Sequence, residues 1–218
     1  MALNASVGRK YAMALSGFFL LLFLLQHMVI NFTSVVSPET YNAASHFMGT
    51  NLIVQLILQP ILAFAVVFHL VMGIVLDFQN RAARPVKYGY SKPETSSPWV
   101  SRNMIITGVM ILLFLGLHFY DFWFPELKIK YIDGVWDQEN RYFAELQHKF
   151  HDPVRTALYV FAFVFLALHL LHGFQSAFQS VGFRHNKYTP MIKKLGNLYA
   201  VLVPAGFVII AIYHYLGQ

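Results

Sequence analysis

Cysteine is absent from the 218 residues, and charged residues are scarce. Without cysteine the chain forms no disulfide, binds no iron–sulfur cluster through thiolates and attaches no haem through a Cys-x-x-Cys-His motif. Charged residues make up only 12% of the chain and hydrophobic residues make up 57%, which is unlike a soluble globular protein. The composition therefore predicts a membrane protein, in which any haem is bound without a covalent link.

Long stretches without charge indicate where the chain crosses a bilayer. A span needs roughly 20 apolar residues to cross about 30 Å of hydrocarbon. The first stretch is too long for a cleavable signal peptide, so we expect it to remain as a helix. The whole chain, 1–218, is then a single membrane domain of the all-α class. We expect a bundle of five transmembrane helices, near 11–32, 51–78, 103–124, 154–180 and 196–216.

The basic residues indicate the orientation of the bundle. The N-terminus and the loops 79–102 and 182–194 hold eleven of the sixteen Lys and Arg residues. Positively charged loops stay on the cytoplasmic side, so the N-terminus is predicted inside and the C-terminus outside. The net charge of +6 is thus a topology signal. The sequence does not predict nucleic-acid binding, because it has no stripe of basic residues interleaved with aromatic residues.

The connections outside the spans predict two short helices. Ser37-Pro38-Glu39 is a plausible cap and first turn of a surface helix. The loop 125–152 carries most of the acidic residues, and we expect it to be solvated, with a short helix around 138–150. No internal repeat is evident along the chain.

Four histidines lie inside four different predicted spans: His27, His69, His118 and His169. An imidazole is costly in hydrocarbon, so such residues usually face the protein interior and carry function. Counting about 1.5 Å per residue from the inner helix ends places His27 and His118 both roughly 22 Å from those ends, past the midplane towards the outside. The same count places His69 at roughly 14 Å and His169 at roughly 16 Å. The four residues therefore form two pairs, each matched in depth.

Two facing imidazoles can occupy both axial positions of a haem iron, which leaves no open position for oxygen and favours electron transfer. Zinc and copper also bind imidazole, but two isolated pairs fall short of the three or four ligands that zinc prefers. The pattern predicts two non-covalent haem groups. His172 lies three residues after His169 and on nearly the same face, so either could be the ligand. A haem-free structural anchor and an ion transporter with a histidine relay are the alternatives.

Four segments carry a resemblance to a known family: Leu25–Asn31, Tyr41–Met48, Val67–Gly73 and Leu166–His169. They resemble the dihaem cytochrome b membrane anchor of succinate dehydrogenase and fumarate reductase, in its single-subunit, five-helix form. In similar anchors a Trp-Gly follows the ligand of the fourth helix at a fixed interval. Val181-Gly182 stands at that place here, and this register selects His169 over His172.

The resemblance implies two haem b groups. His27 and His118 would hold a distal haem near the outer face, and His69 and His169 would hold a proximal haem near the cytoplasm. The chain would be the membrane anchor and electron-transfer subunit of a succinate:quinone oxidoreductase, complex II. It would pass electrons from an iron–sulfur subunit through both haems to a quinone, expected to be menaquinone. The dicarboxylate site would lie on another subunit, and no catalytic residue is assigned to this chain.

The resemblance also implies partners and a location. A flavoprotein and an iron–sulfur subunit would dock on the basic cytoplasmic face, and lipid would surround the chain as a multi-pass protein of the bacterial cytoplasmic (inner) membrane. Quinone contacts are expected near the outer helix ends, at Asn31 and His46. A cytochrome b subunit of another quinone-linked dehydrogenase is the enzymatic alternative, because it needs the same histidines.

Overall fold

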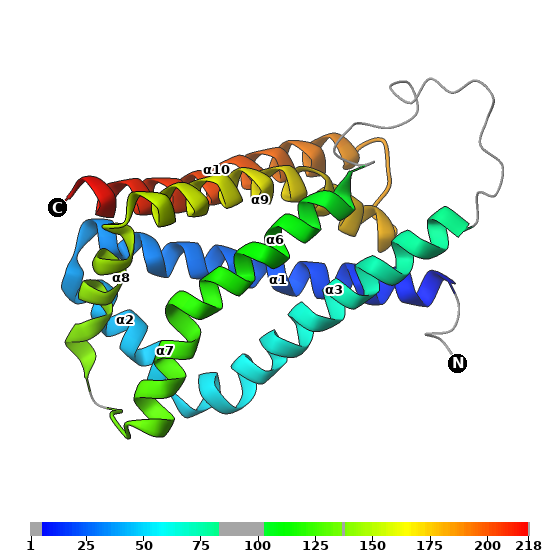
Figure 1. Ribbon diagram of the computed structural model, residues 1–218. Coiled ribbons are helices and arrows are strands. Elements are labelled where there is room, and N and C mark those ends of the chain that lie inside the picture. The colour runs from blue at the N-terminus through cyan, green and yellow to red at the C-terminus, as the bar shows by residue number, and fades with distance from the viewer. Residues whose placement is uncertain (1–5, 83–102, 137, 218) are drawn as a thin grey trace.

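The computed structural model describes residues 6–82, 103–136 and 138–217, and these residues form helices and connecting turns without a strand (Figure 1). Five helical stretches among them are long and apolar enough to cross a membrane, which confirms the predicted fold class. These stretches are Val7–Val36, Val54–Ala82, Met104–Ile132, Pro153–Ser180 and Thr189–Leu216. The elements in chain order are α1 (Ser6–Val36), α2 (Pro38–Thr50), η2 (Val54–Leu58), α3 (Gln59–Ala82), α6 (Met104–His118), η3 (Phe119–Trp123), α7 (Phe124–Leu127), η4 (Lys128–Ile132), η5 (Glu139–Arg141), α8 (Tyr142–Phe150), α9 (Pro153–Ser180) and α10 (Thr189–Leu216).

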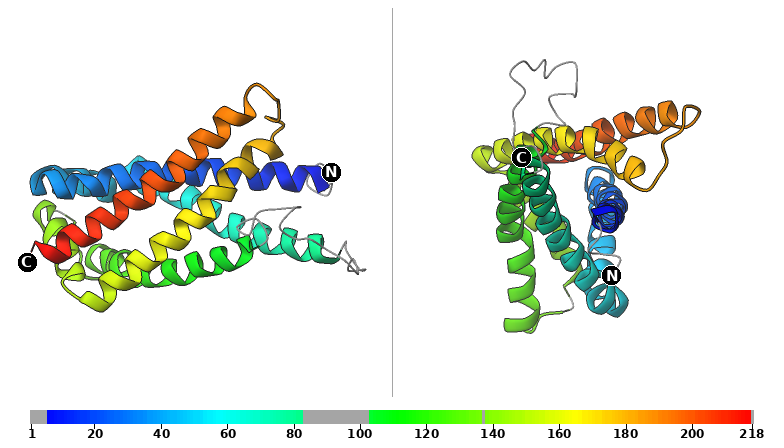
Figure 2. Two further views of the ribbon diagram at one scale, coloured as in Figure 1. Left: turned by 90° about the horizontal axis from the view of Figure 1, so that it is seen from above. Right: turned by 90° about the vertical axis from the view of Figure 1, so that its right-hand side faces the viewer.

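The long helices run along one direction, with the short helices gathered at one end (Figures 1 and 2). The start of α1, the end of α3 and the connection from α9 to α10 lie together at the other end. The described basic residues of the predicted cytoplasmic face come from these segments: Arg9, Lys10, Arg81, Arg184, Lys187, Lys193 and Lys194. Arg84, Lys87, Lys92 and Arg102 lie outside the described residues. Which end faces the cytoplasm stays a prediction.

The buried core lies between α9 and α10 and extends to the short helices. It consists of Tyr41, Leu146, Phe150, Tyr159, Phe163, Val203, Phe207, Ile210 and Ala211. Two glycines of α10 allow close approach there, because a Cβ at Gly196 would lie 2.8 Å from the Phe174 ring and one at Gly206 would lie 2.9 Å from Met28 Sδ. By contrast, most side chains of α3 are exposed or only half-buried, and in a bilayer such apolar surface faces lipid.

The third span is longer than predicted. It continues through η3, α7 and η4 to Ile132 rather than ending near 124, and Lys130 within it is only 3% exposed. Lys130 pairs with Glu126 at 2.5 Å and donates to the Gly49 carbonyl, while Arg141 pairs with Glu126 and Glu145. The expectation that 125–152 forms a solvated loop is therefore wrong for its first part, because mutual pairing lets these charges be buried in a helix.

The two short helices are confirmed. Ser37 caps α2 by accepting a hydrogen bond from the Thr40 N–H at 3.1 Å, with Pro38 in the first turn. The helix expected around 138–150 is η5 followed by α8. The fifth span begins at Thr189, seven residues before its predicted start at 196, and contains the basic residues Lys193 and Lys194 in its exposed first turns.

Candidate functional site

His27 on α1 and His118 on α6 face each other, with ring centroids 5.8 Å apart and ring planes at 83°. Each ring stacks on a phenylalanine one turn earlier on its own helix. Phe23 lies 5.4 Å from His27, and Phe114 lies 5.7 Å from His118, measured between ring centroids. Among the described residues, His118 Nδ1 is buried without a hydrogen-bond partner. The structure thus brings the two rings together between two helices; what they bind stays a prediction.

His69 on α3 and His169 on α9 each meet a hydroxyl group of a neighbouring helix. His69 Nδ1 lies 3.1 Å from Ser16 Oγ on α1, and His169 Nδ1 lies 3.1 Å from Thr107 Oγ1 on α6. His172, the alternative ligand, lies three residues after His169 on α9 and is half-buried. His69 and His169, which the depth count places nearer the basic end than His27 and His118, are called the deeper histidines below, and they are held from different helices by the same kind of contact.

The two helix pairs, α1 with α3 and α6 with α9, repeat one pattern. Helices α1 and α6 share the motif Met-x2-(Ser/Thr)-Gly-x5-Phe-x3-His, at 13–27 and 104–118. Helices α3 and α9 share His-x3-Gly, at 69–73 and 169–173. The expectation that the chain lacks an internal repeat is therefore wrong. The repeat is hard to see in the sequence because the shared positions are sparse, and they are separated by 91 residues in one motif and by 100 in the other.

The repeat extends to the contacts between the helices. A Cβ at Gly73 would lie 3.6 Å from Met13 Cε, and one at Gly173 would lie 3.5 Å from Met104 Cε. Likewise, a Cβ at Gly17 would lie 3.6 Å from His69 Cε1, and one at Gly108 would lie 3.8 Å from His169 Cε1. Each of these two glycines therefore lies directly beside the Cε1 edge of an imidazole. The hydroxyl, glycine and methionine contacts around the two deeper histidines are therefore duplicated.

The donor set fits haem better than a bare metal ion. Within the described part of the chain, no three His, Cys, Asp or Glu residues are grouped to hold a metal ion. A porphyrin supplies four nitrogens and asks the protein for two axial ligands. Two metal–nitrogen bonds of about 2 Å would place the ligating nitrogens roughly 4 Å apart, with the ring centres further out. The 5.8 Å between the His27 and His118 centroids agrees with such a pair.

Asn31 and His46, the predicted quinone contacts, have different neighbours. Asn31 lies one turn after His27; its side-chain amide donates to the His27 carbonyl at 2.8 Å and is 3.4 Å from His27 Nδ1. His46 is half-buried on α2, with its ring centroid 6.4 Å from that of Tyr142. Burial raises the pKa of Tyr142 to about 12, so this phenol is protonated at neutral pH and donates to Glu126 at 3.2 Å.

A buried acidic residue lies next to His27 and His118, which we call the outer histidine pair. Asp121, one turn after His118, lies 3.2 Å from Arg155 Nη1 and accepts a hydrogen bond from the Tyr159 hydroxyl at 3.0 Å. The Tyr159 ring in turn lies edge-on to His118, at 6.4 Å between centroids. No sequence motif singled out Asp121 as part of the site. An acid one turn after a membrane histidine was the signal that could have pointed to it.

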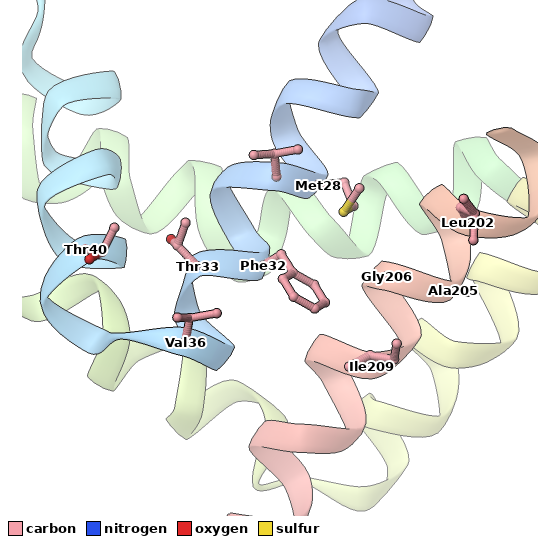
Figure 3. Close-up of a pocket in the computed structure, with 10 residues that line it drawn as sticks. Met28, Phe32, Thr33, Val36, Thr40, Leu202, Ala205, Gly206 and Ile209 are labelled. Atoms are coloured by element: carbon pink, nitrogen blue, oxygen red, sulfur yellow. The ribbon is translucent and has the colours of Figure 1, made fainter.

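An apolar groove of about 490 Å³ opens beside the outer pair, between α1 and α10 (Figure 3). Met28 and Phe32 of α1 face Leu202, Gly206 and Ile209 of α10, and Thr40 lies at the α2 end. Met28 directly follows His27 in the chain. The lining is almost entirely apolar, so the groove offers no metal ligand.

Comparison with known proteins gives one informative similarity. The chain is 28% identical over 103 residues to the succinate dehydrogenase cytochrome b558 subunit of Bacillus subtilis (strain 168). The matched region spans 46% of this chain and 46% of the relative, slightly under half the length of each. No protein-family profile and no solved structure matches the chain. The similarity supports, at the level of the family, the resemblance to membrane-anchor cytochromes b of succinate dehydrogenase.

Proposed function

We infer that this chain is the membrane-anchor cytochrome b subunit of a succinate:quinone oxidoreductase and that its four span histidines hold two haem b groups. The duplicated helix pairs carry this inference, because each pair contributes one histidine to each layer. The named relative supports the same assignment. The chain is then one part of an oxidoreductase complex, whose dicarboxylate chemistry takes place on another subunit.

Each histidine pair has a distinct task in this assignment. His27 and His118 hold the distal haem, and His69 and His169 hold the proximal haem. When bound, the two haems supply one-electron transfer between an iron–sulfur subunit and a quinone, menaquinone by the family resemblance. Because two histidines would hold each iron, the protein would leave no position open for oxygen. Phe23 and Phe114 stack on the distal pair and keep it dry and oriented.

The two ends of the bundle have different functions in this proposal, subunit docking at one end and quinone binding at the other. The basic end is the cytoplasmic face of a bacterial inner membrane, where a flavoprotein and an iron–sulfur subunit dock. The quinone binds near the other end, where the Asn31 amide and the His46 imidazole supply polar groups for its carbonyl oxygens. Apolar surface along the helices contacts lipid.

The first test is haem stoichiometry. The complex purified from haem-replete membranes should contain two haem b groups per chain by its reduced-minus-oxidised spectrum and by haem extraction. His118→Ala should lose the distal haem and retain the proximal one, because only one layer loses a ligand. His214→Gln is the matched control: His214 is a buried span histidine bonded to Ser34 and outside both pairs. It should keep both haems.

Three outcomes would contradict the proposal. A colourless complex favours the haem-free structural anchor, and two retained haems in His118→Ala refute the distal pair. Co-purification identifies the dehydrogenase: a flavoprotein with succinate-oxidising activity supports the assignment. A different catalytic subunit in its place would overturn it in favour of another quinone-linked complex.

A further inference from the structure

The hydroxyl groups of Ser16 and Thr107 determine which nitrogen of the deeper histidines carries the proton. Ser16 Oγ donates its only hydrogen to the Met13 carbonyl at 2.8 Å, and Thr107 Oγ1 donates its only hydrogen to the Met104 carbonyl at 2.9 Å. Each oxygen can then only accept from the imidazole 3.1 Å away. This geometry favours a proton on Nδ1 of both rings, which leaves the lone pair on Nε2.

The same arrangement occurs on both sides of the deeper layer. Ser16 precedes His27 by eleven residues on α1, and Thr107 precedes His118 by eleven residues on α6. Eleven residues are close to three helical turns, so each hydroxyl shares a face with the outer histidine of its own helix. Helices α1 and α6 thus each carry one outer ligand and one hydroxyl that holds a deeper ligand of the neighbouring helix.

We propose that Ser16 and Thr107 are positioning residues, which hold His69 and His169 in the Nδ1-protonated tautomer with Nε2 free to bind the proximal haem iron. This inference rests on the proposed function. Metal-bound histidines generally donate their second N–H to a neighbouring group, which fixes the ring and strengthens the ligand. The outer layer, His27 and His118, lacks this arrangement. His27 Nδ1 lies 3.4 Å from the Asn31 amide nitrogen, which is a donor and not an acceptor, and His118 Nδ1 has no hydrogen-bond partner among the described residues.

The variants Ser16→Ala and Thr107→Val remove the two hydroxyls one at a time. Each should weaken retention of the proximal haem by about 10- to 100-fold, the usual effect of losing such a partner. Each should also raise the midpoint potential of that haem, because an imidazole that no longer donates is a poorer ligand for ferric iron. The distal haem should keep its potential. The conservative variants Ser16→Thr and Thr107→Ser should restore both properties.

Thr33→Val is the matched control on α1. The Thr33 hydroxyl donates to the Ile30 carbonyl at 2.6 Å, as Ser16 does to Met13, and the structure gives it no bond to a histidine. Haem content is measured by extraction, and the potentials are measured by redox titration followed by optical and electron paramagnetic resonance spectra of the purified complex. Thr33→Val should leave both haems and both potentials unchanged.

The outcomes separate this inference from the proposed function. A wild-type complex without two haems overturns the proposed function and this inference with it. Two haems in the wild type with unshifted potentials in Ser16→Ala and Thr107→Val overturn this inference alone. It also fails if the two variants affect different haems, or if Thr33→Val loses haem to the same extent as they do.

Discussion

Gly196 and Gly116 both lie inside membrane helices, but their surroundings differ. A Cβ at Gly196 would lie 2.8 Å and 3.2 Å from two atoms of the Phe174 ring, and Gly196 is buried where α9 meets α10. Phe174 has little freedom to move, because its ring packs between those of Phe178 and Tyr199. A Cβ at Gly116 would meet nothing within 4 Å.

Gly196→Ala should therefore lower the free energy of unfolding by about 1–3 kcal/mol, the usual cost of overpacking a core. Gly116→Ala should raise it by up to about 1 kcal/mol, because alanine favours the helix more than glycine does and its Cβ would meet no neighbouring atom. Unfolding of the purified protein in mixed detergent micelles measures both values. Equal losses for the two variants would show that the α9–α10 contact is not tight.

At the scale of elements, one group of charges joins the end of the third span to two other elements. Glu126 of α7 pairs with Lys130 of η4 and with Arg141 of η5, and Lys130 donates to the Gly49 carbonyl of α2. Lys130 and Arg141 have side chains that are 2% and 13% exposed. Removing Glu126 leaves a buried cation without its partner, which is more costly than removing an exposed pair.

Glu126→Gln should therefore lower the free energy of unfolding by about 3 kcal/mol. The control is Asp77→Asn, which breaks the exposed pair with Arg81 on α3, where the two side chains are 34% and 64% exposed. It should cost less than about 1 kcal/mol. The same detergent unfolding experiment compares them. A loss for Glu126→Gln no larger than that for Asp77→Asn would mean that water screens the group.

The third span also shows how far the sequence can predict the structure. Charge-free stretches predicted the existence of all five spans, because apolar length alone determines whether a helix can cross a bilayer. They misplaced the end of the third span, because they could not show that its charges are buried by pairing. Glu126 neutralises Lys130 one turn along the same helix, and the two groups that complete this contact are distant in the sequence: the Gly49 carbonyl precedes Lys130 by 81 residues and Arg141 follows it by eleven.

The sequence likewise predicts some residues of the candidate site and not others. The depth count led to His27 and His118, because a regular helical rise converts residue number into position along a span. It could not reveal Ser16 and Thr107, since a hydroxyl that bonds to its own helix is ordinary in a membrane span and its second contact depends on how the helices pack.

At the scale of the whole molecule, the orientation can be measured directly because the chain has no cysteine. A single introduced thiol is then the only one in this chain. Asn186 and Asn140 are both exposed, and they lie at opposite ends of the bundle, in the α9–α10 connection and in η5 beside α8.

In intact spheroplasts, a membrane-impermeant maleimide should label Asn140→Cys and spare Asn186→Cys, because the basic end is expected inside. After permeabilisation and denaturation in detergent both should react to the same extent, which controls for the reactivity of each thiol and for cover by docked subunits. Labelling of Asn186→Cys alone in intact spheroplasts would invert the orientation and move the docking face for the soluble subunits to the other side.

The position of the buried core has a consequence for biosynthesis. The core lies mainly in α9 and α10, which leave the ribosome after the histidine helices α1, α3 and α6. Those early helices are apolar enough to insert one by one, with mean hydropathies of 2.1, 2.4 and 1.9 over their most apolar stretches. Helices α1 and α3 can pack on each other as soon as both are inserted, but α6 remains in the lipid without its main partner, α9, until the C-terminal hairpin is made. Translation of that hairpin is therefore the step that completes the buried core and joins α6 to the other helices.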